Sequence, residues 1–379
     1  MPEMSKYSFL DDYSEGAHPD VLAALVKANF AQHGVYGGDD PSEQARDHIR
    51  RHLDSPDAAV HFVPSGTSAN AISIAAVLRP HEAVIAANSG HIVVRETGAV
   101  EATGHKIIVV EPEPKTGKLT PAIIEQALDE NWHFPHMAKP RLVYISQATE
   151  IGTIYSKAEL QALRKICTAN RLLLFMDGAR LPAALASRKC DLTLKDVLEL
   201  TDIFWIGGTK NGALLGEAII IKDAELAADF GFHVKQAGCL LAKTWVMGVQ
   251  FAALFEKQLF LDIAAHANQM AQKLSAGVLQ NGGEVVADVE TNQVFAILEE
   301  DLVKDLQQSF DFYIWSKMSD SGADRPRRVV IRLVTSYATD PSQVDRFIAR
   351  IKMRGMKHHI EDREDSPRRK KVKRADSDD

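Results

Sequence analysis

Short runs of Val, Ile, Leu and Phe recur between residues 59 and 221, and they constrain the fold more than any other feature of the chain. The runs lie at 59–63, 83–87, 106–110, 141–146, 172–177, 202–207 and 217–221. Most are separated by segments long enough for a helix, and they lack polar alternation. Such strands are covered on both faces, as in a mainly parallel sheet flanked by helices. The last two runs are too close for a helical crossover, so we expect that pair to be antiparallel.

The pattern changes near residue 261 and predicts a second, smaller domain. A helical periodicity over 263–280 ends at the plausible C-cap Gly282-Gly283, and the strand candidates VFAILEE, DFYIWSK and RVVIRLVTS follow. A further helix is expected from about Pro341 to Arg354. The fold class is therefore α/β. We expect an arm at 1–18, a large domain at 19–260 with a mainly parallel seven-stranded sheet, a small α+β domain at 261–356 and a disordered charged tail at 357–379.

Charge and composition exclude several classes of protein. The 44 Lys and Arg against 51 Asp and Glu leave a net charge of −7, which argues against a nucleic-acid-binding protein. Three cysteines support neither a disulfide framework nor a zinc cluster, and no uninterrupted apolar run is long enough for a membrane span. We expect a cytoplasmic protein. The run PRRKKVKR can be read as a nuclear localisation signal, but a solvated tail is favoured.

Polar features follow the predicted strands at the positions where open α/β sheets place ligands. In PSGTSAN (64–70), backbone N–H groups and the hydroxyls of Ser65, Thr67 and Ser68 can form an anion cup at a helix N-terminus. This segment matches neither a dinucleotide fingerprint nor a P-loop. Alone, such a turn is more often a simple helix cap.

Three more residues extend this set. Asp177 ends an apolar strand, so it needs a partner: Arg180, a protonated ligand nitrogen or, least favoured, a metal. Lys210 lies between glycines after another apolar strand and is either a phosphate contact or a Schiff-base amine. His91, on its own, is more often a cap or a core residue. A ligand with a phosphate, an aromatic ring, a basic ring nitrogen and an aldehyde would use all of these features, and pyridoxal 5′-phosphate is that ligand.

Several longer motifs occur in an order typical of one enzyme family. They are DDYSEGAHP, VYGGDDP, HFVPSGTSAN, HEAVIAANSGHI, ETGAVEATGHK, DGARL, GGTKNG, KQAG and RLVTSYATD. With them the chain resembles the low-specificity L-threonine aldolases, in the β-eliminating-lyase branch of the fold-type-I pyridoxal-phosphate enzymes. The resemblance implies an aspartate-aminotransferase-like fold and cleavage of L-threonine or L-allo-threonine to glycine and acetaldehyde. It also implies a homotetramer, a dimer of dimers with active sites at the dimer interface.

The resemblance also implies roles for residues around the cofactor. Lys210 would form an aldimine with it, and Asp177 would keep the ring nitrogen protonated so that a quinonoid can store electrons. His91 would stack on the ring and help to handle the β-hydroxyl proton, for which a water or His133 are alternatives. The phosphate would be held by the residues of the cup, Ser65, Gly66, Thr67 and Ser68.

A second group of residues is implied for the substrate and the subunit interface. Arg332 would bind the substrate carboxylate, with Ser14 and Arg180 nearby. A planar guanidinium suits a bidentate contact with a carboxylate. By the same resemblance, Tyr36 and Lys235 would reach the site of a neighbouring subunit. No metal ligand is expected.

Two alternative functions stay open at this point. The same scaffold can support amino-acid racemisation or β-elimination, because pocket contacts decide which Cα bond is broken. A non-catalytic, nucleus-targeted binding protein would instead use PRRKKVKR. The presence of Lys210, Asp177 and Arg332 together argues against such a decayed enzyme.

Overall fold

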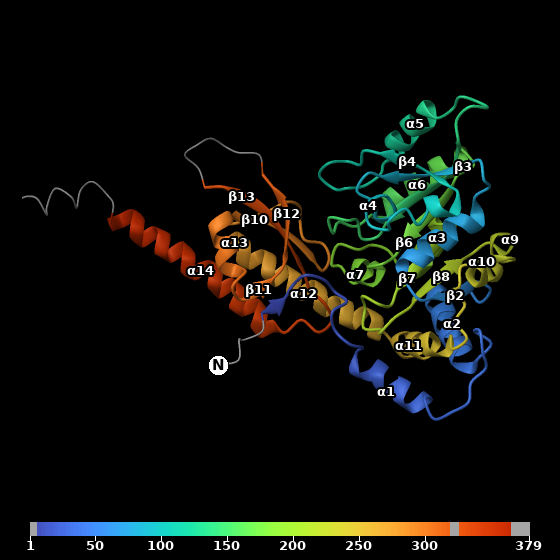
Figure 1. Cartoon of the computed structure of the whole chain (residues 1–379), viewed down its shortest axis with the longest axis horizontal. Coiled ribbons are helices and arrows are strands. Elements are labelled where there is room, and N and C mark those ends of the chain that lie inside the picture. The colour runs from blue at the N-terminus through green and yellow to red at the C-terminus, as the bar shows by residue number, and fades with distance from the viewer. Residues whose placement is uncertain (1–5, 319–325, 365–379) are drawn as a thin grey trace, which may run out of the picture.

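The computed structural model describes residues 6–318 and 326–364. They form a large α/β domain and a smaller domain, and the long helix α12 (Leu259–Gln280) runs from one into the other (Figure 1). Within these described ranges, no helix is long and apolar enough to cross a membrane.

A seven-stranded sheet forms the centre of the large domain, as the sequence predicts. Its strands lie in the order β2 (Ala59–Val63), β8 (Glu217–Ile221), β7 (Ile203–Gly207), β6 (Leu173–Asp177), β5 (Lys139–Ser146), β3 (Glu82–Ala87) and β4 (Lys106–Val110). Strand β8 runs antiparallel to both of its neighbours, and the other pairs are parallel. The expected antiparallel pairing of the last two strands is therefore confirmed.

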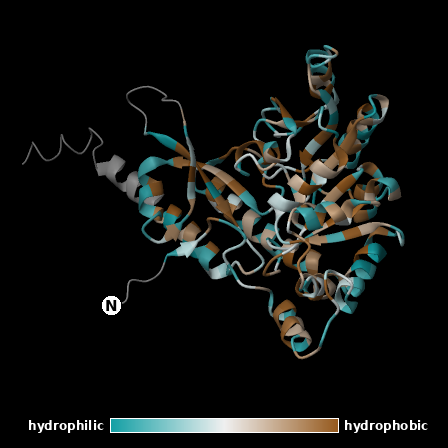
Figure 2. Ribbon diagram, turned by 45° about the vertical axis from the view of Figure 1, so that its right-hand side comes forward, coloured by the Kyte–Doolittle hydropathy of each residue, from teal (hydrophilic) through white to brown (hydrophobic). Residues whose placement is uncertain are grey.

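Helices cover both faces of this sheet, which explains why its strands are apolar throughout. Successive residues of β6 enter opposite cores: Leu174 and Met176 pack on one face, and Leu173 and Phe175 on the other. The first face is covered by α2 (Asp40–Leu53), α5 (Pro121–Glu130), α6 (Lys157–Ala169), α8 (Leu194–Leu200) and α11 (Trp245–Phe255). The second is covered by α3 (Gly66–Val77), α4 (His91–Val94), α9 (Ala224–Ala227) and α10 (Phe230–Gln236). Figure 2 shows hydrophobic residues concentrated along these strands.

The smaller domain is an antiparallel sheet packed against helices. Its strand order is β12 (Tyr313–Lys317), β13 (Arg328–Val334), β10 (Gln293–Glu299) and β9 (Glu284–Val285). The N-terminal arm joins it, because β1 (Tyr7–Ser8) pairs with β11 (Phe310–Asp311) and Phe9 is buried in its core. The helices that pack on it are α12, α13 (Glu300–Leu306) and α14 (Pro341–Glu364).

The element boundaries differ from the expected domain limits in two places. The limit expected between residues 260 and 261 falls inside α12, whose first turns pack in the large domain and whose later turns pack in the small one. Helix α14 continues to Glu364, so residues 357–364 are helical rather than disordered. Its first turns are fixed by packing, and Lys, Arg and Glu extend a nucleated helix at little cost. The rest of the expected tail, 365–379, lies outside the described residues.

Candidate active site

Loops from several strands converge at one edge of the large sheet and enclose a cavity of about 450 Å³. They follow the carboxyl ends of β2, β3, β5, β6 and β7, and β8 begins at the same edge. The polar residues that line the cavity are Tyr13, Ser65, Thr67, Asn70, His91, Ser146, Thr149, Glu150, Asp177, Arg180, Thr209, Lys210 and Glu217. The structure thus brings together the cup, His91, Asp177, Arg180 and Lys210, which the sequence places far apart.

The anion cup is the first turn of α3. Ser65 caps this helix: its Oγ accepts from the backbone N–H of Ser68 at 3.2 Å, and the Ser68 hydroxyl donates to the Ser65 carbonyl at 2.7 Å. A Cβ at Gly66 would lie 2.7 Å from the Trp205 ring, so the close approach of that indole requires glycine. Ser65, Gly66 and Thr67 line the cavity, and the backbone N–H groups of a first helical turn, which lack partners within the helix, suit a phosphate.

Asp177 is buried at the end of β6 and holds its carboxylate with neutral donors. It accepts hydrogen bonds from the Tyr144 hydroxyl at 2.6 Å, the Asn70 amide at 2.9 Å and the Ala179 backbone N–H at 3.0 Å. Within the described part of the chain, no Lys or Arg forms an ion pair with it. The alternative in which Arg180 neutralises Asp177 is therefore wrong.

Arg180 pairs instead with Asp12, a residue of the N-terminal arm. Its Nε lies 2.7 Å from one Asp12 oxygen and its Nη2 lies 2.9 Å from the other. Asn292 of the small domain donates to the same carboxylate at 2.8 Å. Burial is the largest single effect and raises the pKa of Asp12, but the charges of Arg180 and Lys210 and the hydrogen bonds from Arg180 and Asn292 together outweigh it and hold that pKa below its usual value. The arm thus fixes the Arg180 guanidinium beside the cavity.

Lys210 follows β7 in a tight turn and is surrounded by charges of both signs. Burial and the Arg180 charge lower the pKa of Lys210, while Asp12, Asp177 and Glu217 act in the opposite direction. The net effect lowers the pKa of Lys210, so a larger fraction of this side chain is the neutral amine, which is the nucleophilic form. A lysine with a lowered pKa is suited to imine formation with an aldehyde.

Glu217 is a buried carboxylate that supports the turn carrying Lys210. It accepts from the Thr209 hydroxyl and from the Gly208 backbone N–H, each at 2.8 Å. Burial raises the pKa of Glu217 to about 7, and these two hydrogen bonds offset only part of that effect. A half-buried carboxylate, Glu150, accepts from the Ser146 hydroxyl at 2.7 Å, and loss of solvation raises its pKa as well.

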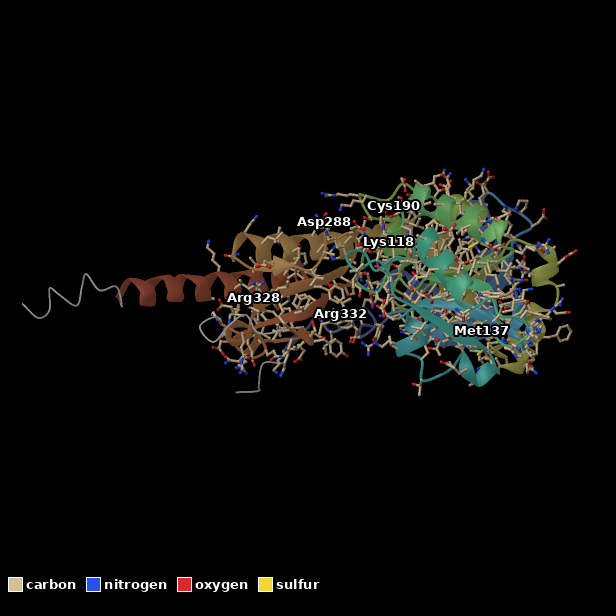
Figure 3. The ribbon with its side chains drawn as sticks, turned by 90° about the horizontal axis from the view of Figure 1, so that it is seen from above. Lys118, Met137, Cys190, Asp288, Arg328 and Arg332 are labelled. Carbon is tan, nitrogen blue, oxygen red and sulfur yellow. The ribbon has the colours of Figure 1, made fainter. Side chains whose placement is uncertain are left out.

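Arg332 lies on β13 beside the cavity rather than in its lining. Figure 3 shows it on the part of the small domain that adjoins the large domain. Its Nε and Nη2 donate to the Gln293 side-chain oxygen at 3.2 and 2.9 Å, and its guanidinium lies 5.5 Å from the centre of the Trp315 ring. Burial and the neighbouring Arg180 charge lower the pKa of Arg332 to about 10.

Three of the expected site residues lie away from the cavity in this single chain. Ser14 is exposed and donates to Asp11 at 2.8 Å. Tyr36 is exposed, with the Lys235 ammonium 4.1 Å from its ring centre. His133, an alternative for the proton acceptor, is exposed in the loop before β5 and does not line the cavity.

Several cavity residues were missed by the sequence analysis. Asn70 was within the PSGTSAN motif, and Glu217 opens the apolar run EAIII, where a charged residue is a usable signal. Glu150 follows the apolar run 141–146 by a few residues. Asp12 and Tyr13 lie within the motif DDYSEGAHP, but the motif does not indicate their contacts, because these depend on the path of the arm.

The arrangement fits pyridoxal phosphate. Asp177 can meet a protonated ring nitrogen, the first turn of α3 can take the phosphate, and Lys210 can reach the aldehyde. Fold and site together define a fold-type-I pyridoxal-phosphate-dependent enzyme.

The similarity of this chain to known proteins identifies its family within this class of enzymes. The family model for beta-eliminating lyases matches residues 10–301. A low-specificity L-threonine aldolase from a Pseudomonas species is 36% identical over 93% of this chain and 99% of its own length. That of Pseudomonas aeruginosa is 34% identical over 89% and 94%. The solved threonine aldolase of Leishmania major is 44% identical, covers 92% of this chain and 99% of its own, and superposes with a TM-score of 0.88.

The chain belongs to the beta-eliminating lyase family. It is a pyridoxal-phosphate-dependent lyase, and the resemblance read from the sequence motifs is confirmed. At the level of fold alone, it is also similar to the aspartate aminotransferase of Thermus thermophilus, which is 16% identical with a TM-score of 0.68 and covers 92% of this chain and 91% of its own.

Proposed function

We propose that this enzyme cleaves β-hydroxy-α-amino acids, converting L-threonine and L-allo-threonine to glycine and acetaldehyde. The observation that carries the proposal is the cavity in which half-buried Lys210, buried Asp177 and the first turn of α3 converge. The names of the relatives, which are similar to this chain over most of their length, support the same reaction.

In this proposal the cofactor is held at three points. Lys210 would hold it through its amine, Asp177 would meet the ring nitrogen, and Ser65, Gly66, Thr67 and Ser68 of the cup would take the phosphate. When bound, pyridoxal phosphate supplies the electron sink that lets a bond to the substrate Cα break. The support from this chain is the neutral-donor environment of Asp177 and the lowered pKa of Lys210.

The substrate carboxylate is bound by Arg332 and Arg180 in this proposal. Asp12 already orients Arg180, so little side-chain freedom has to be lost when the substrate binds. Ser14 follows the cavity residue Tyr13 in the arm and completes this group. His91 takes the β-hydroxyl proton, because its ring lines the cavity whereas His133 does not.

We also propose a homotetramer built as a dimer of dimers. Apolar side chains on α1 (Pro19–Ala28) and just after it are uncovered in the single chain, with 49% of Leu22, 55% of Val26 and 86% of Phe30 exposed. Burial of such a face against another copy is favourable. Tyr36 and Lys235 would then reach the site of the neighbouring subunit. The cytoplasmic location stays a prediction from the sequence, and the PRRKKVKR segment lies outside the described residues.

The purified enzyme with added pyridoxal phosphate should release acetaldehyde and glycine in equal amounts from L-threonine or L-allo-threonine. Acetaldehyde is measured with a coupled alcohol dehydrogenase and glycine by chromatography. Lys210→Ala should abolish both products, while the exposed Lys222→Ala should not. Failure of the wild-type protein to release an aldehyde from any β-hydroxy amino acid would overturn the proposal, and α-hydrogen exchange in deuterated water without cleavage would indicate a racemase instead.

A further inference from the structure

A buried carboxylate that the proposed roles leave unused lies behind His91. The side chain of Glu96, just after α4, has no solvent-exposed surface. One of its oxygens, Oε1, is 2.7 Å from His91 Nδ1 and accepts from the Asn70 amide at 2.7 Å. The other, Oε2, is buried and has no hydrogen-bond partner among the described residues.

The charge of this carboxylate needs a positive partner. A buried anion without one is costly, because it loses the solvation of water. Across the described residues, His91 is the one cationic group that forms an ion pair with Glu96. Tyr144 and Glu150 also lie near the pair, and Asp177 interacts with both of them; these groups are anionic or neutral and cannot compensate that charge. A proton on His91 is therefore stabilised by Glu96.

The hydrogen bond also assigns the two ring nitrogens of His91. Nδ1 donates to the ionised Glu96, so Nε2 is the nitrogen that can accept a proton. The His91 side chain is 41% exposed and lines the cavity, so Nε2 is accessible to a substrate there.

Asn70 connects this pair to the other side of the site. Its amide donates to Glu96 and to Asp177, and its carbonyl oxygen accepts from the Trp205 ring N–H at 3.0 Å. The Trp205 bond fixes the orientation of the amide, so both of its N–H groups face carboxylates. His91, proposed to lie on the ring face of the cofactor, and Asp177, proposed to contact its ring nitrogen, therefore share one hydrogen-bond network.

We propose that Glu96 is the positioning residue of His91: it fixes the Nε2-acceptor tautomer and stabilises the ring once Nε2 has taken the β-hydroxyl proton. This inference rests on the proposed function. In the step, the proton leaves the substrate oxygen for Nε2 and the O–H electrons form the C=O bond of the departing aldehyde. The Cα–Cβ electrons stay on the glycine fragment.

The test is a double-mutant cycle with Glu96→Gln, His91→Phe and the combined variant, and the exposed Glu101→Gln as matched control. Glu96→Gln should lower kcat by roughly 10- to 100-fold, which is less than the loss expected when a general base is removed. It should change KM by less than about threefold. In the His91→Phe background it should change kcat by less than about twofold. Equal losses in both backgrounds would overturn the proposal, because Glu96 would then act independently of His91.

A second readout does not depend on turnover. Diethyl pyrocarbonate modifies the unprotonated imidazole, and the fraction of His91 modified is measured by mass spectrometry against pH, with and without cofactor. Loss of the Glu96 charge should move the midpoint to lower pH, because the carboxylate 2.7 Å from Nδ1 no longer stabilises the protonated ring. Glu96→Asp keeps the charge, so its midpoint should lie close to that of the wild type. This comparison remains available even if Glu96→Gln folds poorly. An unmoved midpoint in Glu96→Gln would contradict the pairing, whereas a wild-type protein that releases no aldehyde would refute the proposed function and leave this readout intact.

Discussion

Glu217→Gln tests whether the buried carboxylate beside Lys210 titrates as its surroundings require. The pKa of Glu217 is raised from 4.5 to about 7 by burial. Between pH 4.5 and about pH 7, Glu217 is ionised in the unfolded chain but protonated in the folded chain, so the free energy of unfolding falls as pH rises. Gln cannot titrate, so the free energy of unfolding of Glu217→Gln should lack this decrease.

The magnitude follows from the size of the shift. Where the folded chain binds one proton more than the unfolded chain, the free energy of unfolding falls by about 1.4 kcal/mol per pH unit. Between pH 5 and pH 8, the free energy of unfolding of the wild type should therefore fall by about 2.5 kcal/mol through Glu217. Removal of the negative charge also lowers the pKa of Lys210 further, and this acts in the same direction. For a chain of this length, the difference amounts to roughly 3 °C in Tm.

The assay is differential scanning fluorimetry of the cofactor-free protein from pH 5 to pH 8, with the exposed Glu225→Gln as control. Relative to wild type, Glu217→Gln should gain stability as the pH rises, while the control should follow the wild type. If wild type and Glu217→Gln show the same pH dependence, Glu217 is not the perturbed acid that we describe.

Two further predictions concern the substrate and the assembly. Arg332→Lys should raise KM for L-allo-threonine by roughly 10- to 100-fold, because a bidentate charged contact is worth about 1.5–3 kcal/mol. The control Arg328→Lys, at a residue of the same strand that is paired with Glu284, should leave KM unchanged. Equal KM values in wild type and Arg332→Lys would refute the role of Arg332. Leu22→Asp should lower the mass of the assembly measured by light scattering, because it places a charge on the exposed apolar face of α1. Leu279→Asp, at another exposed apolar residue, should leave that mass unchanged. The same mass for both variants as for wild type would exclude the α1 face as an interface.

Much of the fold could be predicted because the signal is local. A strand buried on both faces must be apolar along its length, so the runs ending at Val63, Asp177 and Gly207 were visible without any tertiary information. Since parallel strands end at one edge, the polar residues after them could be expected to meet. This reasoning located Asp177, Lys210 and the cup.

The partners of these residues could not be predicted, because they come from distant segments. Asp12 reaches Arg180 through the path of the N-terminal arm, and Glu96 opens the motif ETGAVEATGHK but reaches His91 through a turn that the motif does not reveal. Apolar residues recur at helical spacing in α1, but only Val21 among them is buried. Helical spacing predicts the helix and does not tell whether its apolar face meets the core of the same chain or another copy.

The central claim is that Lys210 binds pyridoxal phosphate in an enzyme that cleaves β-hydroxy amino acids. The most direct measurement is the absorption spectrum of cofactor-saturated wild type beside Lys210→Ala, recorded before and after addition of L-allo-threonine. We predict a band near ~420 nm that requires Lys210, followed by a longer-wavelength band and acetaldehyde release. A wild-type protein with no cofactor band would contradict the account, and a band without acetaldehyde would contradict the proposed reaction.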